Sequence, residues 1–499
     1  MKFLRNLGGK LILAGATGIL IAGCGGGGGG GTAAGTTLTQ GVITNFGSVW
    51  VNGTRYHTNS ASVLYDDNPG SESDLAVGMV VTIVSTSNSD GTATASSVSY
   101  DDELKGPIEA GSIDLVNQRM TVLGQVVDTS KAIFDDSSHT LQGLSDLSAG
   151  EVVEISGFPS AATGIDIEAR RVERKAADVD SFLAATGKIE VKGHVDSVDG
   201  GAQTLTINGL TVDWSSADIG DMPVNPASWD SLFVEAKCEG LSAADCFSGN
   251  TLLATKVEPE QEGLSGNADS VEIEGPITEF NGQDDFKVAG QRVDASGAQF
   301  MRGSASDLAN GREIEVKGSL SGGVLQASLV KFEQEDNVRV EGEIEAINGN
   351  VVTVMGIEFT LSSGTEMRDD SSASIRRFSV SDLAIGDAVE IRGFLSGGVI
   401  SASRLEREDN LDADRFIVQA PPGEVDNITD PAFRLLGMVT VDTSALGFND
   451  FQDENDSPIG RASFFARLAS NSPTYERVKA RGTYSGGTLN ANEVEFEND

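Results

Sequence analysis

One pattern recurs six times along the chain after its first 38 residues, and this repetition constrains the fold more than any other feature. Each repeat opens on a segment with Gly-x-Val or Gly-x-Ile and closes on Ala-x-x-Val or Ala-x-x-Leu. Between them lies a segment of alternating polar and apolar residues, such as Val-Glu-Ile-Arg-Gly at 389–393. Alternation with a period of two is typical of β-strands that bury one face. The sequence therefore predicts an all-β tandem array of about six small units.

The fifth repeat shows the predicted strands most clearly, near residues 338–346, 350–355, 357–361, 387–394 and 399–406. Five short strands with an irregular connection between the third and the fourth match a small OB-like barrel, and an SH3-like barrel is the alternative. We number the repeats units 1 to 6 and place them at residues 39–101, 104–175, 188–260, 271–335, 338–408 and 414–498.

Four units carry Asp-Leu-x-x-Gly just before the alternating strand, at residues 74–78, 146–150, 307–311 and 382–386. We expect the Asp to cap a short helical turn, the Leu to plug the barrel end and the Gly to adopt a left-handed conformation. Units 3 and 6 lack the motif, so their connections should differ.

These motifs together resemble an uncharacterised domain family found in bacterial envelope lipoproteins and secreted proteins. The resemblance covers residues 39–498 and is weakest in units 3 and 6. The family has no assigned activity, so the resemblance implies barrels and no chemistry.

The first 23 residues resemble the signal peptide of a bacterial lipoprotein. Three basic residues, Lys2, Arg5 and Lys10, precede an apolar stretch at 11–22, and Ile-Ala-Gly stands directly before Cys24. The resemblance implies cleavage before Cys24 and lipidation of its sulfur, which anchors the protein to a membrane. Gly25, where an Asp would indicate inner-membrane retention, implies the outer membrane of the cell envelope, on its periplasmic or its outer face. Residues 24–38 are then a lipidated, glycine-rich flexible tether.

Two further cysteines, Cys238 and Cys246, are left in an oxidising compartment and are predicted to form a structural disulfide. When unit 3 is aligned with the other units, Cys238 occupies the position of the glycine that ends the alternating strand in those units. Cys246 lies in an insertion at residues 241–247, so the disulfide would staple an enlarged hairpin of unit 3.

The chain has 75 acidic residues against 35 basic ones, a balance that repels nucleic acid and excludes it as a partner.

Acidic pairs recur at one place in three units. Clustered carboxylates can hold calcium, although none of these pairs has EF-hand spacing, and solvated loop acids are the alternative. The pairs are Asp66 and Asp67, Asp135 and Asp136, and Asp369 and Asp370.

No catalytic constellation is recognisable, since the three histidines are scattered and no nucleophile–base pair is evident. We therefore predict a non-enzymatic protein with no cofactor other than the calcium just considered. Two function classes remain: a binding module for a glycan, a matrix component or an envelope protein, or a structural spacer that extends reach from the membrane. The sequence leaves the ligand and the oligomeric state open.

Overall fold

The computed structural model describes residues 35–497, apart from residues 47, 67, 137, 139–140, 186, 241, 265–267, 334–335, 363, 374, 376, 397, 412–414 and 471–474. The predicted signal peptide, Cys24, most of the tether and Asp67 lie outside the described residues. Within the described part, no helix has the length and apolar character needed to cross a bilayer.

Unit 4 shows the architecture that the units share. Its five main strands close into a barrel in which the first strand pairs with the second, the second with the third, the third with the fifth, the fifth with the fourth and the fourth with the first. Only the third and the fifth strand run parallel to each other. This is the five-stranded Greek-key barrel of an OB-like domain, the first of the two predicted alternatives. The strands are β22 (Ser270–Gly282), β23 (Asp285–Val288), β24 (Gln291–Asp294), β26 (Glu313–Ser321) and β27 (Val324–Phe332).

Units 1, 2 and 5 repeat this plan. Unit 1 has β1 (Thr36–Asn45), β2 (Val49–Val51), β3 (Thr54–His57), β6 (Val80–Ser87) and β7 (Ala93–Tyr100). Unit 2 has β8 (Leu104–Pro107), β9 (Arg119–Val122), β10 (Gln125–Asp128), β12 (Val152–Pro159) and β13 (Ile167–Ala176). Unit 5 has β28 (Val338–Asn348), β29 (Val351–Val354), β30 (Ile357–Thr360), β32 (Ala388–Ser396) and β33 (Val399–Glu408).

The connection after the third strand is more regular than the sequence indicates. In these four units it contains a short extra strand that pairs in parallel with the last strand of the barrel. The extra strands are β4 (Ser62–Tyr65), β11 (Ile133–Asp136), β25 (Gln299–Met301) and β31 (Glu366–Asp369). In unit 1, β5 (Asn68–Gly70) adds a hairpin partner to β4.

The Asp-Leu-x-x-Gly motif then forms a single 3-10 turn, as η1 (Glu72–Asp74) shows in unit 1. The Asp ends the turn, and its carboxylate accepts the backbone N–H of Ser71, so it completes a capping box rather than being the first cap as we expected. Leu75 is buried, and Gly78 has φ +89°, as predicted. The equivalent turns are η2 (Leu144–Asp146), η4 (Ala305–Asp307) and η5 (Val380–Asp382).

Units 3 and 6 do have different connections. Unit 3 replaces the extra strand with a loop that leads through η3 (Pro226–Ser228) to the buried Trp229. Unit 6 inserts α3 (Gly460–Leu468), whose Phe464 packs on Phe496 with ring centroids 4.4 Å apart. The strands of unit 3 are β14 (Lys188–His194), β15 (Ser197–Asp199), β16 (Thr204–Ile207), β17 (Leu210–Asp213), β18 (Phe233–Glu239), β19 (Phe247–Ser248), β20 (Thr251–Leu253) and β21 (Lys256–Pro259). Those of unit 6 are β34 (Phe416–Ala420), β35 (Val425–Thr429), β36 (Ala432–Leu435), β37 (Val439–Asp442), β38 (Phe451–Gln452), β39 (Arg477–Ser485) and β40 (Thr488–Glu497), with turns η6 (Pro422–Glu424) and η7 (Phe448–Asp450).

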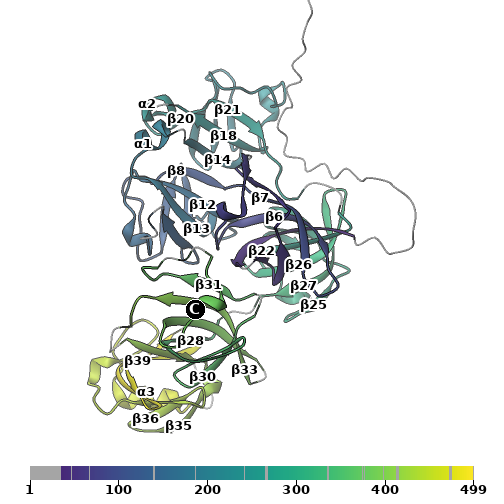
Figure 1. The fold of residues 1–499 in the computed structure, drawn as a ribbon. Helices are drawn as coiled ribbons and strands as arrows, with labels where there is room; N and C mark the ends of the chain where they lie inside the picture. Colours follow the sequence, from purple (N-terminus) through teal and green to yellow (C-terminus); the bar gives the residue numbers. More distant parts are fainter. Residues whose placement is uncertain are drawn as a thin grey trace, which may run out of the picture.

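The units associate in pairs through their first strands, and one pair is not consecutive in the sequence. Strand β1 of unit 1 runs parallel to β22 of unit 4, β8 of unit 2 pairs with β14 of unit 3, and β28 of unit 5 pairs with β34 of unit 6. Figure 1 shows units 1 to 4 gathered together, with units 5 and 6 as a second group below them. Strand pairing between barrels also covers sheet edges that a separate barrel would expose.

Hydrophobic cores are shared across these pairs. Units 2 and 3 contribute to one continuous cluster of buried side chains, and units 5 and 6 to another. Leu38 and Val84 of unit 1 belong to the core of unit 4, and Ile133 of unit 2 belongs to the core of unit 1. Burial across unit boundaries compensates for the small core of each barrel.

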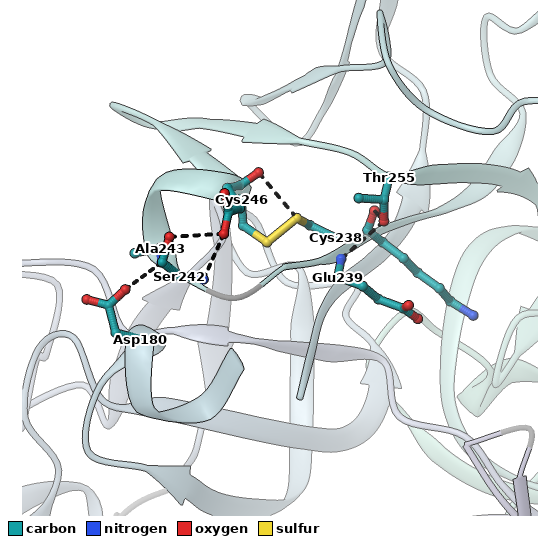
Figure 2. Close-up of a disulfide and its surroundings, with 9 residues drawn as sticks. Asp180, Cys238, Glu239, Ser242, Ala243, Cys246 and Thr255 are labelled. Carbon is teal, nitrogen blue, oxygen red and sulfur yellow. Dashed lines mark hydrogen bonds between the residues drawn. A yellow bond between two sulfur atoms is a disulfide. The ribbon is translucent and has the colours of Figure 1, made fainter. Parts of the chain in front are cut away.

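The disulfide of unit 3 joins Cys238, near the end of β18, to Cys246 at the end of α2 (Ala243–Cys246). Both cysteines are fully buried, and the predicted insertion forms α2. Figure 2 shows that the backbone N–H of Ala243 donates to the Asp180 carboxylate of α1 (Val179–Ala184), at 2.6 Å. This hydrogen bond holds the insertion against the segment that joins units 2 and 3.

Removing this staple should lower the stability of unit 3. In the double variant Cys238→Ser/Cys246→Ser we expect a loss of about 2–3 kcal/mol in the free energy of unfolding, because the unfolded chain regains the freedom of an eight-residue loop. Urea unfolding with and without dithiothreitol measures it: the reductant should destabilise the parent chain and leave the double variant unchanged. Equal midpoints for the reduced and oxidised parent chain would contradict this role.

Candidate functional site

Lys105 lies at the junction of units 1, 2 and 3, where four carboxylates surround its ammonium group. Its Nζ is 2.6 Å from Asp102, 2.6 Å from Glu190, 3.2 Å from Asp66 and 3.2 Å from Glu154. All five residues are buried. Strand β8 supplies Lys105, β12 supplies Glu154, β14 supplies Glu190, and Asp66 follows β4, so three barrels meet at one charge.

The ammonium group takes the place that a metal ion would need. Carboxylate oxygens of Asp66, Asp102 and Glu190 lie within 4.8 Å of one another, close enough to share a cation, but Lys105 contacts all three. Burial opposes ionisation of Asp66, yet Lys105 and Lys188 hold its pKa below the usual value. Burial and the nearby Glu190 raise the pKa of Asp102 well above its usual range. The arrangement is an ion-pair network that joins barrels.

The described acids of the predicted pairs in units 1, 2 and 5 are likewise held by basic side chains. Asp66 contacts Lys188 at 3.0 Å as well as Lys105. In unit 2, Asp135 pairs with Arg171 and Asp136 with Arg174. Each of these carboxylates therefore already has a cationic partner supplied by the chain itself, an alternative that the sequence reasoning did not weigh.

In unit 5, Arg407 binds both carboxylate oxygens of Asp369, at 2.8 and 2.6 Å. Asp370 accepts from Arg368 at 2.7 Å. Burial and a hydrogen bond with Glu406 raise the pKa of Asp370 to about 9, so this carboxyl keeps its proton at neutral pH. A protonated carboxyl and an arginine-bound carboxylate are poor calcium ligands.

The structure brings the acidic pair of unit 5 close to Asp135, one member of the pair of unit 2. A pocket of about 50 Å³ between units 2 and 5 is lined by Asp135, Asp369 and Asp370, together with Arg171 and Arg368. Its volume leaves room for little more than water. Unit 5 is held there by Gln142, whose side chain donates to the carbonyl of Asp370 at 3.4 Å, and by the ion pair of Arg377 with Glu72 at 2.7 Å.

A larger cavity lies where units 1 to 4 meet, with a volume of about 210 Å³. Each of the four units, or a segment joining them, contributes to its wall. Apolar surface comes from Leu64, Phe233 and Leu264, and charge comes from one lysine and four acids. The charged residues are Lys192, Asp101, Glu103, Glu260 and Glu262.

Only some of these charges are neutralised within the protein. Lys192 binds Asp101 at 2.6 Å, and Glu262 binds Lys287 at 2.8 Å and approaches His194 at 3.5 Å. Among the described residues, no hydrogen bond or ion pair reaches the carboxylate of Glu103. Burial, with Asp101 and the other acids nearby, raises the pKa of Glu103 to about 7 despite the opposing effect of Lys192. Burial also raises the pKa of Glu260.

These raised pKa values make the stability of the chain depend on pH. Burial raises the pKa of Glu103, Glu235 and Glu341 to about 7 and that of Glu274 to about 8. The folded chain then binds more protons than the unfolded chain between about pH 5 and 8, so stability should fall as pH rises. We expect the free energy of unfolding to be several kcal/mol larger at pH 5.5 than at pH 8, since each of these groups contributes roughly 2 kcal/mol over this range.

Urea unfolding at a series of pH values measures this dependence. Glu274→Gln should reduce the loss of stability near pH 8. Glu358→Gln, at an exposed position, should leave the pH dependence unchanged. Below about pH 4 the trend should reverse, because Asp66, Glu154 and Asp369 have lowered pKa values and lose their ion pairs when protonated. Stability that rises steadily from pH 5.5 to 8 would contradict the account.

The cavity residues were missed by sequence reasoning, which looked for sites inside repeats. Asp101 ends unit 1 and Glu103 follows it, and Glu260 ends unit 3 and Glu262 follows it. Both boundary segments are rich in acids, but this composition indicates only negative charge and does not indicate a binding site. Their proximity depends on the pairing of unit 1 with unit 4, which no local pattern reveals.

Comparison with known proteins agrees with the repeat. The family model for a domain of unknown function, DUF5666, matches residues 40–99, 105–173, 274–331 and 341–406, which are units 1, 2, 4 and 5. Together the matches cover about half of the chain. A search of the curated proteins finds no match. The chain therefore belongs to the DUF5666 family and carries its domain in at least four tandem copies.

Proposed function

We propose that this chain is a non-enzymatic, membrane-anchored lipoprotein of the bacterial cell envelope, in which units 1 to 4 form a module that binds a ligand. The observation that carries the proposal is the cavity of about 210 Å³ to which all four units contribute. A small-molecule site is a concave, mostly preformed space with apolar walls and a few convergent polar groups. The cavity is concave and combines apolar residues such as Leu64, Phe233 and Leu264 with polar and charged residues that make up about half of its lining.

The pairing of the units supports a binding module over a spacer. A spacer gains reach when successive barrels follow one another in a line. Here β1 pairs with β22 across more than 200 residues of sequence, which folds the first four units back on themselves. Unit 5 packs against this group through Arg377, which binds Glu72 of unit 1, and through the carbonyl of Asp370, which accepts from Gln142 of unit 2.

The anchor is proposed from the sequence alone. The apolar stretch before Cys24 and the small residues at 22–23 support lipidation at this cysteine, and Gly25 supports the outer membrane. The calcium alternative receives less support, because the described acids of the predicted pairs are bound by lysine or arginine.

Two measurements test this function. Metabolic labelling with an alkyne fatty acid in a Gram-negative host should label the parent chain in the membrane fraction, and Cys24→Ala should abolish the label. Label that persists in Cys24→Ala would contradict anchoring at this residue. For binding, a thermal-shift screen of small molecules should give stabilisation that is lost when Ser99→Trp fills the cavity wall. If no compound raises the melting temperature of the parent chain in a way that Ser99→Trp removes, a binding role for the cavity is contradicted.

A further inference from the structure

We propose that the cavity between units 1 to 4 binds a small organic cation, an alkylammonium compound, with its charged group between Glu103 and Glu260. The proposal rests on the binding function proposed above and names the chemical class of the ligand. It is argued from the charge of the wall, the partners of each charged group and the apolar surface beside them.

The wall carries more negative charge than the protein neutralises. Four carboxylic acids and one lysine line the cavity, and the lysine is bound to Asp101 at 2.6 Å. Glu262 has its own partners in Lys287 and His194. Glu260 accepts one backbone N–H, from Gln261 at 3.1 Å. Among the described residues, no hydrogen bond or ion pair reaches the carboxylate of Glu103, although Lys192 lowers its pKa. Two carboxyl groups are thus left for a ligand.

Electrostatics within the cavity favour a cation at these two groups. Asp101, Glu260 and Glu262 disfavour ionisation of Glu103, and Asp101 also disfavours ionisation of Glu260. Lys192 only partly offsets these effects. A positive charge placed between Glu103 and Glu260 would replace repulsion by two attractive interactions, in surroundings where burial strengthens both. The same carboxylates would repel an anion.

The remaining wall favours an organic cation over a metal ion. A volume of about 210 Å³ is much larger than one ion requires, and Leu64 and Leu264 offer surface to alkyl groups. The ring of Phe233 lines the same space and can face a cation. The Asp101 side chain is 44 % exposed, so the cavity reaches solvent on that side and a ligand has a way in.

Calorimetric titration of the soluble chain beginning at residue 25 tests the proposal. The probe is 1,4-diaminobutane at pH 8, with 1,4-butanediol as the uncharged molecule of the same shape and calcium chloride as the inorganic cation. We expect saturable binding of the diamine and none of the diol. Binding should weaken from pH 8 to pH 6, because Glu103 gains a proton in this range. Asp101, Lys192, Glu260 and Glu262 are the other charged groups that face it.

Variants assign the binding to the cavity. Glu103→Gln and Glu103→Gln/Glu260→Gln should weaken binding of the diamine roughly tenfold or more, since each removes a carboxylate that pairs with the buried ammonium. Glu358→Gln, an exposed glutamate of unit 5, is the matched control and should bind like the parent chain. Both glutamine variants should fold, because they replace carboxyls that burial already disfavours as ions.

The outcomes separate this proposal from the binding function itself. Equal binding of the diol, or of an anion such as succinate in place of the diamine, would overturn the cationic class and leave a binding cavity. Calcium that binds as tightly as the diamine and competes with it would replace the organic ligand by an inorganic one. Diamine binding unaffected by both glutamine variants would overturn the site.

Discussion

Replacing Lys105 by methionine should destabilise the chain by about 3–5 kcal/mol, the largest effect we expect of any single substitution. The methionine fills a similar volume but leaves Asp66, Asp102, Glu154 and Glu190 without the ammonium that all four contact. Removing one partner of a buried ion pair leaves an uncompensated charge, which costs more than the pair itself contributes. Urea unfolding measures the loss.

Two further variants show whether charge is the cause. Lys131→Met removes a lysine that is 51 % exposed and should change stability by less than about 1 kcal/mol. Adding Glu190→Gln to Lys105→Met removes one of the stranded carboxylates and should recover part of the loss. If Lys105→Met unfolds at the urea concentration of the parent chain, the network does not hold units 1, 2 and 3 together.

Truncation of Leu38 to alanine should cost about 2–5 kcal/mol, the second-largest effect. Leu38 lies in unit 1 but belongs to the core of unit 4, beside Val271 on the neighbouring strand. The substitution should therefore loosen two units that are separated by more than 200 residues. Hydrogen exchange should accelerate in both β1 and β22, although only β1 is altered.

The matched control is Leu115→Ala, at a leucine of unit 2 that is 50 % exposed. Surface truncation of this kind should stay within about 0.5 kcal/mol of the parent chain. Faster exchange in β1 alone after Leu38→Ala would mean that units 1 and 4 are energetically independent.

The sequence predicts the units themselves well because the evidence for them is local. Alternation at 389–393 indicates a strand, and the structure places β32 there. The Asp-Leu-x-x-Gly motif predicts the left-handed glycine, which Gly78 and Gly311 confirm. The disulfide was predictable from the oxidising compartment and the eight-residue spacing of Cys238 and Cys246, and the alignment of units located it in the enlarged hairpin of unit 3.

The arrangement of the units was not predictable in the same way. Pairing of β1 with β22 depends on backbone groups that every strand presents, so no residue pattern marks the partner. The sequence did not predict that Arg171 and Arg174 bind the acidic pair of unit 2. These residues are brought together by the parallel pairing of β11 with β13, which is a long-range feature. The cavity depends on the pairing of unit 1 with unit 4, so the sequence did not predict it either.

Zero-length cross-linking of the unmodified chain tests the central claim, the folded-back assembly of units 1 to 4, most directly. A carbodiimide joins an amine to a carboxylate only where the two are in contact, and Lys131 of unit 2 lies 3.0 Å from Glu313 of unit 4. We predict a cross-linked tryptic peptide pair containing these residues, formed equally at dilutions that exclude contact between molecules. Cross-links confined to single units and consecutive neighbours, with this pair absent, would contradict the assembly and leave the chain as a string of separate barrels.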